Sequence, residues 1–301
     1  MWKGMMPAVT TKFTEDGAID GAEMERCIGL QMDAGNNGVI VCGTLGEGSM
    51  LSQDERIDVL KIAKSACGNK PVLLTVNEAG TREACELAQK ANKAGADGLM
   101  IVPSPIYHTN RQETLDNLNA ITQAGDLPVM IYSNRVAYRV DVTPDMMMEL
   151  AADERFVAIK ESSDDIRRTT EVFNMCGDRY DVFTGVDNLG LEALCMGADG
   201  WVSGVSIAFP EENQRLYDLF RAGRLEEARE IYRWMRPLLD LDVSTSLVQQ
   251  IKLAEAIAIG STEYVRSPRK PLAGEHRVRV EKIVRDQIAV RPDLSKYKVE
   301  A

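Results

Sequence analysis

The sequence predicts an α/β protein, a (β/α)8 TIM barrel followed by a C-terminal helical extension. Eight short apolar runs recur along the chain, and each is followed by a segment whose apolar residues have helical spacing. The run at residues 156–160 ends on Lys160 and leads into polar residues that favour the start of a helix. This order places an amine at the carboxyl end of a buried strand, where barrels of this class carry their active sites.

A doubly wound open sheet is the competing architecture. It predicts fewer β–α units and a glycine-rich phosphate loop after the first strand, but residues 10–13 are Thr-Thr-Lys-Phe. The count of eight therefore favours the closed barrel. The expected strands are residues 5–9, 38–42, 72–76, 98–102, 129–132, 156–160, 182–184 and 200–202.

Local signals mark several of the helices between these strands. Residues 52–55 form a capping box at the start of one helix, and Thr143-Pro144 starts another with proline at the first helical position. Gly95 and Gly197 stand in two similar turns that we interpret as helix C-terminal caps leading into the next strand.

The last part of the chain is expected to be helical, with helices within residues 216–260 and 277–290. We place the catalytic barrel at residues 1–222 and the extension at residues 223–301. No linker rich in Pro, Gly or Ser separates the two, so the extension should pack on the barrel.

Composition limits the possible partners. The 301 residues are 45% hydrophobic and 27% charged, with a net charge of −11, which is typical of a globular enzyme. Nucleic-acid and anionic-membrane surfaces need clustered positive charge, so we expect neither partner. The chain starts without a signal-like segment, contains no run of membrane-spanning length, and has six scattered cysteines without a CxxC pair. We therefore expect a cytoplasmic protein with reduced cysteines.

Lys160 is the candidate nucleophile. Burial favours the neutral amine, which can attack a carbonyl or imine carbon. A lysine at a strand end is often only a solvated terminus, so its neighbours carry the argument. Tyr132 ends the preceding strand, and neighbouring strands of a barrel project side chains into the same cavity. A phenol there can carry protons to and from the intermediate.

Thr44 and Tyr107 also follow predicted strands, and a threonine hydroxyl can relay a proton between two tyrosines. The simpler interpretations are that Thr44 caps a turn and that Tyr107 packs under a loop.

The sequence gives little support for a metal site or a nucleotide-binding loop. The glycines at positions 43, 46 and 48 match neither GxGxxG nor GxxxxGK. Only two histidines are present, which excludes a histidine-rich zinc centre. A magnesium site that includes Glu47 and Asp187 stays open, although such acids more often hold loops by hydrogen bonding. We expect no metal and no organic cofactor.

Several segments together resemble one enzyme family. They are Gly43 to Glu47, Tyr132, Ile159-Lys160-Glu161, Gly185 and residues 266–272. In order and spacing, from about residue 3 to about residue 290, they resemble the dihydrodipicolinate synthase / N-acetylneuraminate lyase superfamily of class I aldolase-type barrels. The resemblance implies a homotetramer in which Tyr107 reaches into a neighbour's site.

The resemblance also implies roles for individual residues. Lys160 would form a Schiff base with a 2-oxo acid or cyclic imine, and Tyr132 would be the acid/base, with Thr44 and Tyr107 as its relay. The substrate-binding positions would be Gly43, Leu45, Gly46, Glu47, Gly185 and Val202, with backbone N–H groups of the loop at residues 43–47 holding the substrate carboxylate.

Departures from the family pattern reduce the number of candidate activities. The synthase has two adjacent threonines where this chain has Thr44 and Leu45, and the sialic acid lyase has a serine at the position of Leu45. The dicarboxylate-binding arginine of the synthase corresponds to Ala137, flanked by Arg135 and Arg139.

Residues 132–139 and 160–165 most resemble members that deaminate 1-pyrroline-4-hydroxy-2-carboxylate to 2,5-dioxopentanoate and ammonia. The alternatives are a 2-keto-3-deoxy sugar-acid aldolase or dehydratase, a metal-dependent aldolase, and a catalytically silent barrel that serves as a sugar-acid sensor or scaffold.

Overall fold

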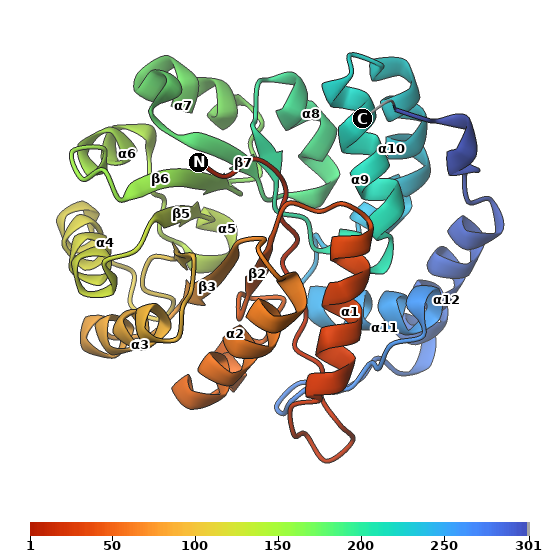
Figure 1. The fold of residues 1–301 in the computed structure, drawn as a ribbon, viewed down its shortest axis with the longest axis horizontal. Helices are drawn as coiled ribbons and strands as arrows, with labels where there is room; N and C mark the ends of the chain where they lie inside the picture. The colour runs from red at the N-terminus through yellow and green to blue at the C-terminus, as the bar shows by residue number, and fades with distance from the viewer. Residues whose placement is uncertain (300–301) are drawn as a thin grey trace.

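Eight parallel strands form the centre of the molecule in the computed structural model, which describes residues 1–299 (Figure 1). Their order around the sheet is β1-β8-β7-β6-β5-β4-β3-β2. The strands are β1 (Gly4–Met5), β2 (Val39–Val41), β3 (Val72–Val76), β4 (Gly98–Ile101), β5 (Val129–Ser133), β6 (Phe156–Glu161), β7 (Asp181–Thr184) and β8 (Gly200–Trp201).

The sheet closes on itself beyond the end of β1. Ala8 bridges Ile40 in parallel, the N–H of Ile40 donates to the carbonyl of Pro7, and the N–H of Val9 donates to the carbonyl of Ile40. The run expected at residues 5–9 is shorter as a regular strand because Pro7 has no N–H to give to the ladder. The predicted (β/α)8 barrel is confirmed, and each of the eight predicted runs coincides with a strand.

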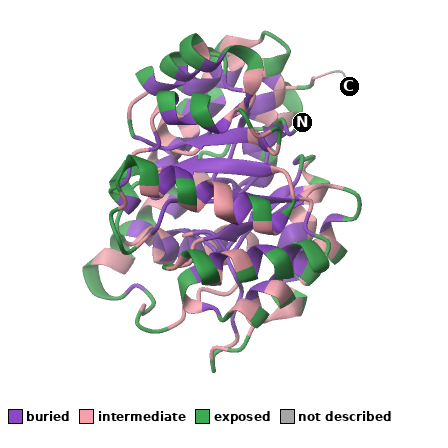
Figure 2. Cartoon of the chain, turned by 90° about the vertical axis from the view of Figure 1, so that its left-hand side faces the viewer, coloured by how far each residue is buried: buried purple, intermediate pink, exposed green. Residues whose placement is uncertain are grey.

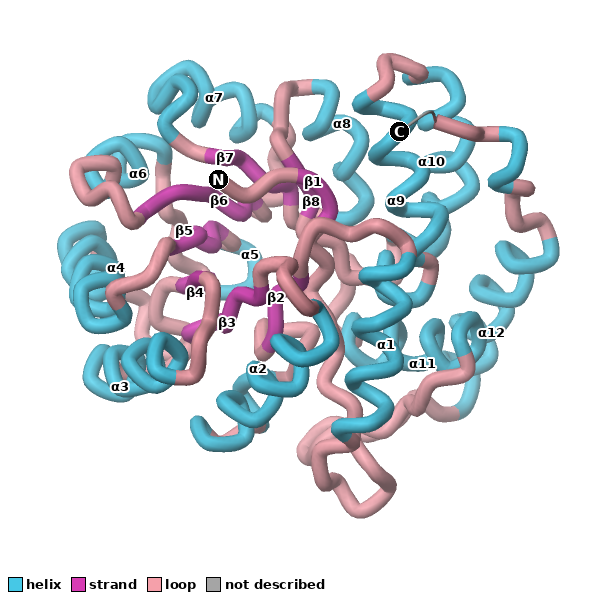
Figure 3. Tube along the Cα trace, in the orientation of Figure 1, coloured by secondary structure: helices cyan, strands magenta, loops and turns pink. Residues whose placement is uncertain are grey.

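Helices surround the strands on all sides in the trace of Figure 3. In the barrel they are α1 (Gly21–Asp33), α2 (Gln53–Cys67), α3 (Thr81–Lys93), α4 (Arg111–Gly125), α5 (Arg135–Tyr138), α6 (Pro144–Leu150), α7 (Arg167–Cys176), α8 (Gly190–Cys195) and α9 (Pro210–Arg221). The later helices are α10 (Leu225–Leu239), α11 (Leu247–Ile259) and α12 (Gly274–Ala289). Short 3-10 turns are η1 (Gly48–Met50), η2 (Gly177–Arg179), η3 (Asp187–Leu189), η4 (Val205–Ala208) and η5 (Leu294–Lys296).

The local helix signals act as expected. Ser52 and Glu55 form the capping box of α2, and Pro144 is the first residue of α6. Gly95 and Gly197 follow α3 and α8 with φ of +85° and +105°, a region that a side chain would disfavour. These residues therefore end their helices and turn the chain toward β4 and β8.

The core lies between the sheet and its helices and continues inside the barrel. Figure 2 shows the buried strands between helices whose outer faces are exposed. Strands β2 to β5 are buried along their whole length, which is typical of parallel strands covered on both faces. This rigid wall positions the side chains that end each strand.

The C-terminal helices differ from expectation in one respect. A non-helical connection of residues 240–246 separates α10 from α11, within the region expected to be helical. Residues 242–246 are Asp-Val-Ser-Thr-Ser, and each has lower helix propensity than the Leu, Glu and Arg of α10. This connection reaches the functional site. α12 also begins three residues before the predicted residue 277.

Two buried ion pairs join α11 to the barrel. Lys12 contacts Glu255 at 2.5 Å, and Lys252 contacts Glu47 at 2.5 Å, with all four side chains at most 1% exposed. These contacts agree with an extension packed on the barrel, although the division at residue 222 stays a prediction. No helix among the described residues is both long and apolar enough to cross a membrane.

Candidate active site

Lys160 and Tyr132 lie side by side at the carboxyl ends of β6 and β5. They are register partners in the parallel ladder, so both side chains point to the same side of the sheet. The Lys160 Nζ lies 4.2 Å from the centroid of the Tyr132 ring, and each residue is 6% exposed. The structure therefore brings these two predicted residues together.

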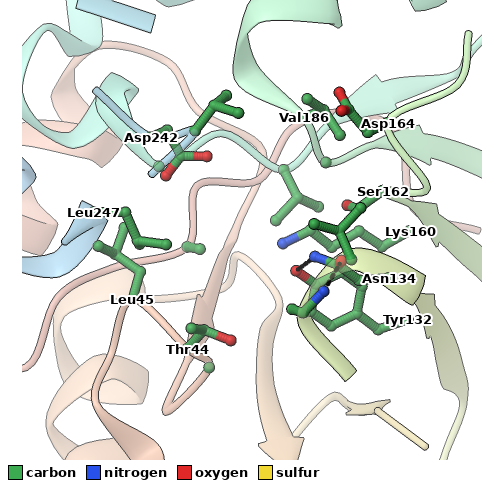
Figure 4. Close-up of a pocket in the computed structure, with 18 of the residues that line it drawn as sticks. Thr44, Leu45, Tyr132, Asn134, Lys160, Ser162, Asp164, Val186, Asp242 and Leu247 are labelled. Carbon is green, nitrogen blue, oxygen red and sulfur yellow. Dashed lines mark hydrogen bonds between the residues drawn. The ribbon is translucent and has the colours of Figure 1, made fainter. Parts of the chain in front are cut away.

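A cavity of about 420 Å³ opens above these two side chains (Figure 4). Its walls come from the ends of several strands and from the connection at residues 240–246. The lining residues are Ala8, Gly43, Thr44, Leu45, Met100, Tyr132, Asn134, Val136, Ala137, Lys160, Ser162, Asp164, Gly185, Val186, Val202, Gly204, Asp242, Val243, Ser244, Thr245 and Leu247.

Burial favours the uncharged form of Lys160, the expected nucleophile. Loss of solvation lowers the pKa of its ammonium to about 8, while the carboxylates of Asp242 and Asp187 partly oppose this shift. At neutral pH about a tenth of the amine is then uncharged, compared with less than about a thousandth for an ordinary lysine. The neutral amine is the form that adds to a carbonyl or imine carbon.

Gly185, which follows β7, leaves room for this lysine. A Cβ at this position would stand 2.3 Å from Lys160 Cε and 2.2 Å from Ser162 Oγ. Its expected place in the pocket is thus observed, and its geometry explains why a glycine is needed there.

Tyr132 is placed to handle protons. Burial raises the pKa of its phenol to about 12, so the hydroxyl keeps its proton at neutral pH. The Nδ2 of Asn134 donates to the Tyr132 hydroxyl at 3.0 Å (Figure 4). The phenolic proton therefore remains available to a reacting group, which suits an acid that protonates an intermediate on Lys160.

Thr44 contacts a tyrosine other than the one expected. Its Oγ1 lies 2.7 Å from the hydroxyl of Tyr138, whose ring packs edge-on against the Tyr132 ring at 5.6 Å between centroids. Tyr107, by contrast, is 60% exposed, donates to Glu113 at 3.3 Å and does not line the cavity. Within one chain Thr44 and Tyr107 therefore do not meet, because the loop after β4 turns Tyr107 outward, and the expected relay through a neighbour's Tyr107 stays a prediction.

The loop at residues 43–47 is only partly in the cavity. Gly43, Thr44 and Leu45 line it, and the N–H groups of Thr44 and Leu45 have no acceptor within residues 1–299. Gly46 and Glu47 do not line it, and the N–H of Glu47 already donates to the carbonyl of Thr44. Of the residues expected to bind the substrate carboxylate, only Gly43, Thr44 and Leu45 therefore line the cavity.

Glu47 and Asp187 both hold loops. The Glu47 carboxylate binds Lys252 Nζ and accepts from the N–H of Arg266 at 3.1 Å. Asp187 accepts from Trp201 Nε1 at 3.0 Å and from the N–H groups of Gly204 and Val205. Residues 1–299 contain no group of three or more His, Cys, Asp or Glu side chains placed to bind a metal.

The sequence patterns did not predict four polar residues that line the cavity, Asn134, Ser162, Asp164 and Asp242. They also did not predict the contact between Tyr138 and Thr44. Asn134 and Ser162 each follow a predicted site residue by two positions, a spacing that points to the same strand end. Asp242 comes from a region expected to be helical and had no such signal. Val202, in contrast, lines the cavity as expected.

The barrel, the buried amine at its carboxyl end and the adjoining phenol together define a lyase of the class I aldolase type. Comparison with known proteins agrees: the chain belongs to the dihydrodipicolinate synthetase family, whose model matches residues 1–287.

Relatives and solved structures match along nearly the whole chain. The 4-hydroxy-tetrahydrodipicolinate synthase of Pelobacter propionicus is 34% identical over 284 residues, which cover 92% of this chain and 96% of that protein. The crystal structure of a dihydrodipicolinate synthase from Bacillus anthracis has a TM-score of 0.89 at 27% identity, covering 95% of this chain and 98% of that one. The synthase from Aquifex aeolicus gives 0.89 at 26% identity, with the same shares covered.

Proposed function

We propose that this enzyme deaminates 1-pyrroline-4-hydroxy-2-carboxylate to 2,5-dioxopentanoate and ammonia. The observation that carries the proposal is the scarcity of cationic side chains in the cavity. Among residues 1–299, Lys160 is the only cationic residue that lines the cavity, whereas Asp164 and Asp242 contribute two carboxyl groups. One carboxylate of a substrate can accept from the free N–H groups of Thr44 and Leu45. A second substrate carboxylate would lie near acidic side chains, with no arginine among the described lining residues to bind it.

Arg135, one of the two arginines that flank Ala137, is engaged outside the cavity. Ala137, not an arginine, lines the cavity at the position where the synthase binds its dicarboxylate. Arg135 donates to the carbonyl of Ser163 at 3.2 Å and faces Asp141 and Asp165 at 3.7 and 3.8 Å. This arrangement argues for a substrate with one carboxylate, although the named relatives are synthases.

The chemistry begins with the cyclic imine. The neutral Lys160 amine adds to carbon 2, and the ring nitrogen leaves that carbon, which opens the ring and gives a Schiff base with a free primary amine on carbon 5. The Schiff base acidifies carbon 3, so loss of a carbon 3 proton and of the carbon 4 hydroxyl releases water.

The remaining steps release nitrogen and product. Movement of the double bond toward carbon 5 gives an enamine and then an imine, with Tyr132 as the proton carrier at carbon 3. Hydrolysis of that imine yields ammonia, and hydrolysis of the Schiff base yields 2,5-dioxopentanoate. One water is released and two are consumed, so the net reaction takes up one water.

A 2-keto-3-deoxy sugar-acid aldolase or dehydratase is the second candidate. It is favoured by the hydroxyl groups of Ser162, Ser244 and Thr245, which line the cavity and suit a polyhydroxylated chain. Both candidates share the Schiff base on Lys160 and differ in the product released.

The test is a panel of 4-hydroxy-1-pyrroline-2-carboxylate, 2-keto-3-deoxy sugar acids, and pyruvate with aspartate semialdehyde. Each substrate is assayed for ammonia, for pyruvate release or consumption, and for a borohydride-trapped adduct on Lys160 by mass spectrometry. We expect ammonia from the cyclic imine. Pyruvate release from a sugar acid without ammonia from the imine would favour the aldolase, and an enzyme that traps no adduct would be a silent barrel.

We also propose a homotetramer, in which Tyr107 reaches into a neighbour's site as the family resemblance implies; the exposure of Tyr107 in this chain supports the proposal. Light scattering after size-exclusion chromatography gives the mass, and a monomer would contradict the proposal.

A further inference from the structure

Asp242 is an acidic side chain in the cavity that the steps above leave without a role. It belongs to the connection between α10 and α11, and it is half-buried. In Figure 4 its carboxyl group and the Tyr132 ring lie on opposite sides of the Lys160 amine. Gly204 makes this position possible, since a Cβ there would stand 2.5 Å from Asp242 Oδ1.

The two carboxyl groups near Lys160 have different surroundings. Asp187 is fully buried and accepts from three donors, as described above. Asp242 has no hydrogen-bond donor or ion-pair partner for its side chain among residues 1–299. A carboxyl group without donors is the one that takes up a proton when two acids lie close together.

The electrostatic environment points the same way. Burial and then the charge of Asp187 raise the pKa of Asp242 well above its usual range, and the charge of Lys160 opposes this shift. Lys160 and Asp187 are the charged groups that act on it. A carboxyl group with a raised pKa keeps its proton to higher pH, and the protonated form can donate to a leaving oxygen.

The reaction needs such a group away from Tyr132. The hydroxyl on carbon 4 leaves poorly as hydroxide, and carbon 4 lies two carbons from the carbon that Lys160 holds. Tyr132 packs directly against Lys160, so it is placed for carbons 2 and 3. A substrate held at carbon 2 by Lys160 would place its distal carbons away from Tyr132, toward the wall that carries Asp242 (Figure 4).

We propose that Asp242 is a second acid/base group of this site, serving the carbon 4 hydroxyl of the substrate; the inference rests on the proposed function. Tyr132 gives its proton to the ring nitrogen when the ring opens, and the resulting phenolate takes the carbon 3 proton to form an enamine. Asp242 then gives its proton to the hydroxyl as the carbon 4–oxygen bond breaks, and the enamine electrons form the double bond between carbons 3 and 4. The resulting carboxylate then takes a proton from carbon 5, which restores the acid.

The experiment compares wild type with Asp242→Asn in D2O. The variant should release ammonia at least about 100-fold more slowly, the lower range for loss of a general acid. It should still form the trapped pyruvate adduct on Lys160 and still exchange the carbon 3 hydrogens for deuterium, because those steps use Lys160 and Tyr132. The fall of kcat at high pH that reports the acid should disappear, and Asp242→Glu should restore part of the rate.

Asp240→Asn is the matched control. Asp240 precedes Asp242 by two residues in the same connection, pairs with Arg236 at 3.1 Å and does not line the cavity. This variant should keep the wild-type rate within about two-fold, since it removes the same charge without touching the site.

The outcomes separate the two proposals. A wild type that releases no ammonia from the imine overturns the proposed function and this inference with it. A wild type that does so while Asp242→Asn matches its rate overturns the role of Asp242 alone. Loss of the pyruvate adduct in Asp242→Asn also overturns it, because Asp242 would then support Lys160 rather than the leaving group.

Discussion

Burial rather than a neighbouring cation lowers the pKa of Lys160, since loss of solvation is the largest cause of the shift. Because only the neutral amine attacks, the rate of adduct formation with pyruvate should rise as pH increases through about 8 and then level off. Quenched borohydride trapping from pH 6 to pH 10 measures this rate. A rate still rising steeply at pH 10 would indicate an ordinary, solvated lysine.

Gly185→Ala tests the space around the same side chain. The added methyl group would press on Lys160 Cε and Ser162 Oγ, so the lysine must move. A displacement near 1 Å costs about 100-fold in rate, and we expect at least that loss of kcat. Gly29→Ala in α1 is the control, because a Cβ there meets nothing within 4 Å. That variant should keep full activity and gain about 0.5–1 kcal/mol of stability.

The tyrosines show which individual residues of the site could be predicted from the sequence and which could not. Lys160 and Tyr132 were predictable because strand periodicity fixes which side chains end neighbouring strands. Tyr107 was placed by its position after a strand, but the direction of a loop side chain depends on packing that a sequence pattern does not encode. Tyr138 ends α5, a four-residue helix too short to give a periodic signal.

At the scale of elements, the loop after β2 depends on α11. Glu47 has a left-handed backbone with φ of +53°, and its buried carboxylate binds Lys252. Lys252→Met leaves that carboxylate without its ammonium, which should cost about 3–5 kcal/mol of unfolding free energy. Urea denaturation measures the change.

The double variant Glu47→Gln/Lys252→Met should recover much of this loss, because no buried charge is then left unpaired. Lys282→Ala is a matched control, since Lys282 and Asp286 form an exposed i,i+4 pair on α12 whose loss should cost less than about 0.5 kcal/mol. A single Lys252→Met variant as stable as wild type would contradict the role of the pair.

The connection at residues 240–246 marks the limit of prediction for elements. Good helix formers on both sides led to an expectation of helices across residues 216–260, and α10 and α11 are indeed there. Asp242 reaches the cavity only because the chain leaves the helix after Leu239. Helix periodicity locates amphipathic segments, but a break of a few residues changes the average pattern little.

At the scale of the whole molecule, the order of strands and helices was predictable because each β–α unit repeats the same pattern of apolar residues. The contacts between units that are far apart in the sequence were not predictable. Lys12 and Glu255 are separated by 243 positions, and nothing in either local pattern indicates that they meet in the core. Such pairs bind the last helices to the first strands.

Barrel and extension should therefore unfold together. The contact between them consists of buried side chains, including Ile251 and Ala254 of α11, which are both 0% exposed. It also includes the buried ion pairs of Lys12 with Glu255 and of Lys252 with Glu47. Separating the two would leave charges and apolar surface uncompensated, which disfavours a half-folded state. Native-state hydrogen exchange in increasing urea should give β6 and α11 amides the same opening free energy and the same urea dependence.

The exposed turn at residues 294–296 serves as an internal reference for local opening. Its amides should exchange with a lower free energy and a smaller urea dependence than those of β6, because none of its residues is buried. Peptide-level mass spectrometry resolves all three segments in one sample. An α11 that opens at lower free energy than β6, with a smaller urea dependence, would mean that the helical extension unfolds as a separate unit. Asp242, which lies in the connection that leads into α11, would then leave the active site whenever that unit opens.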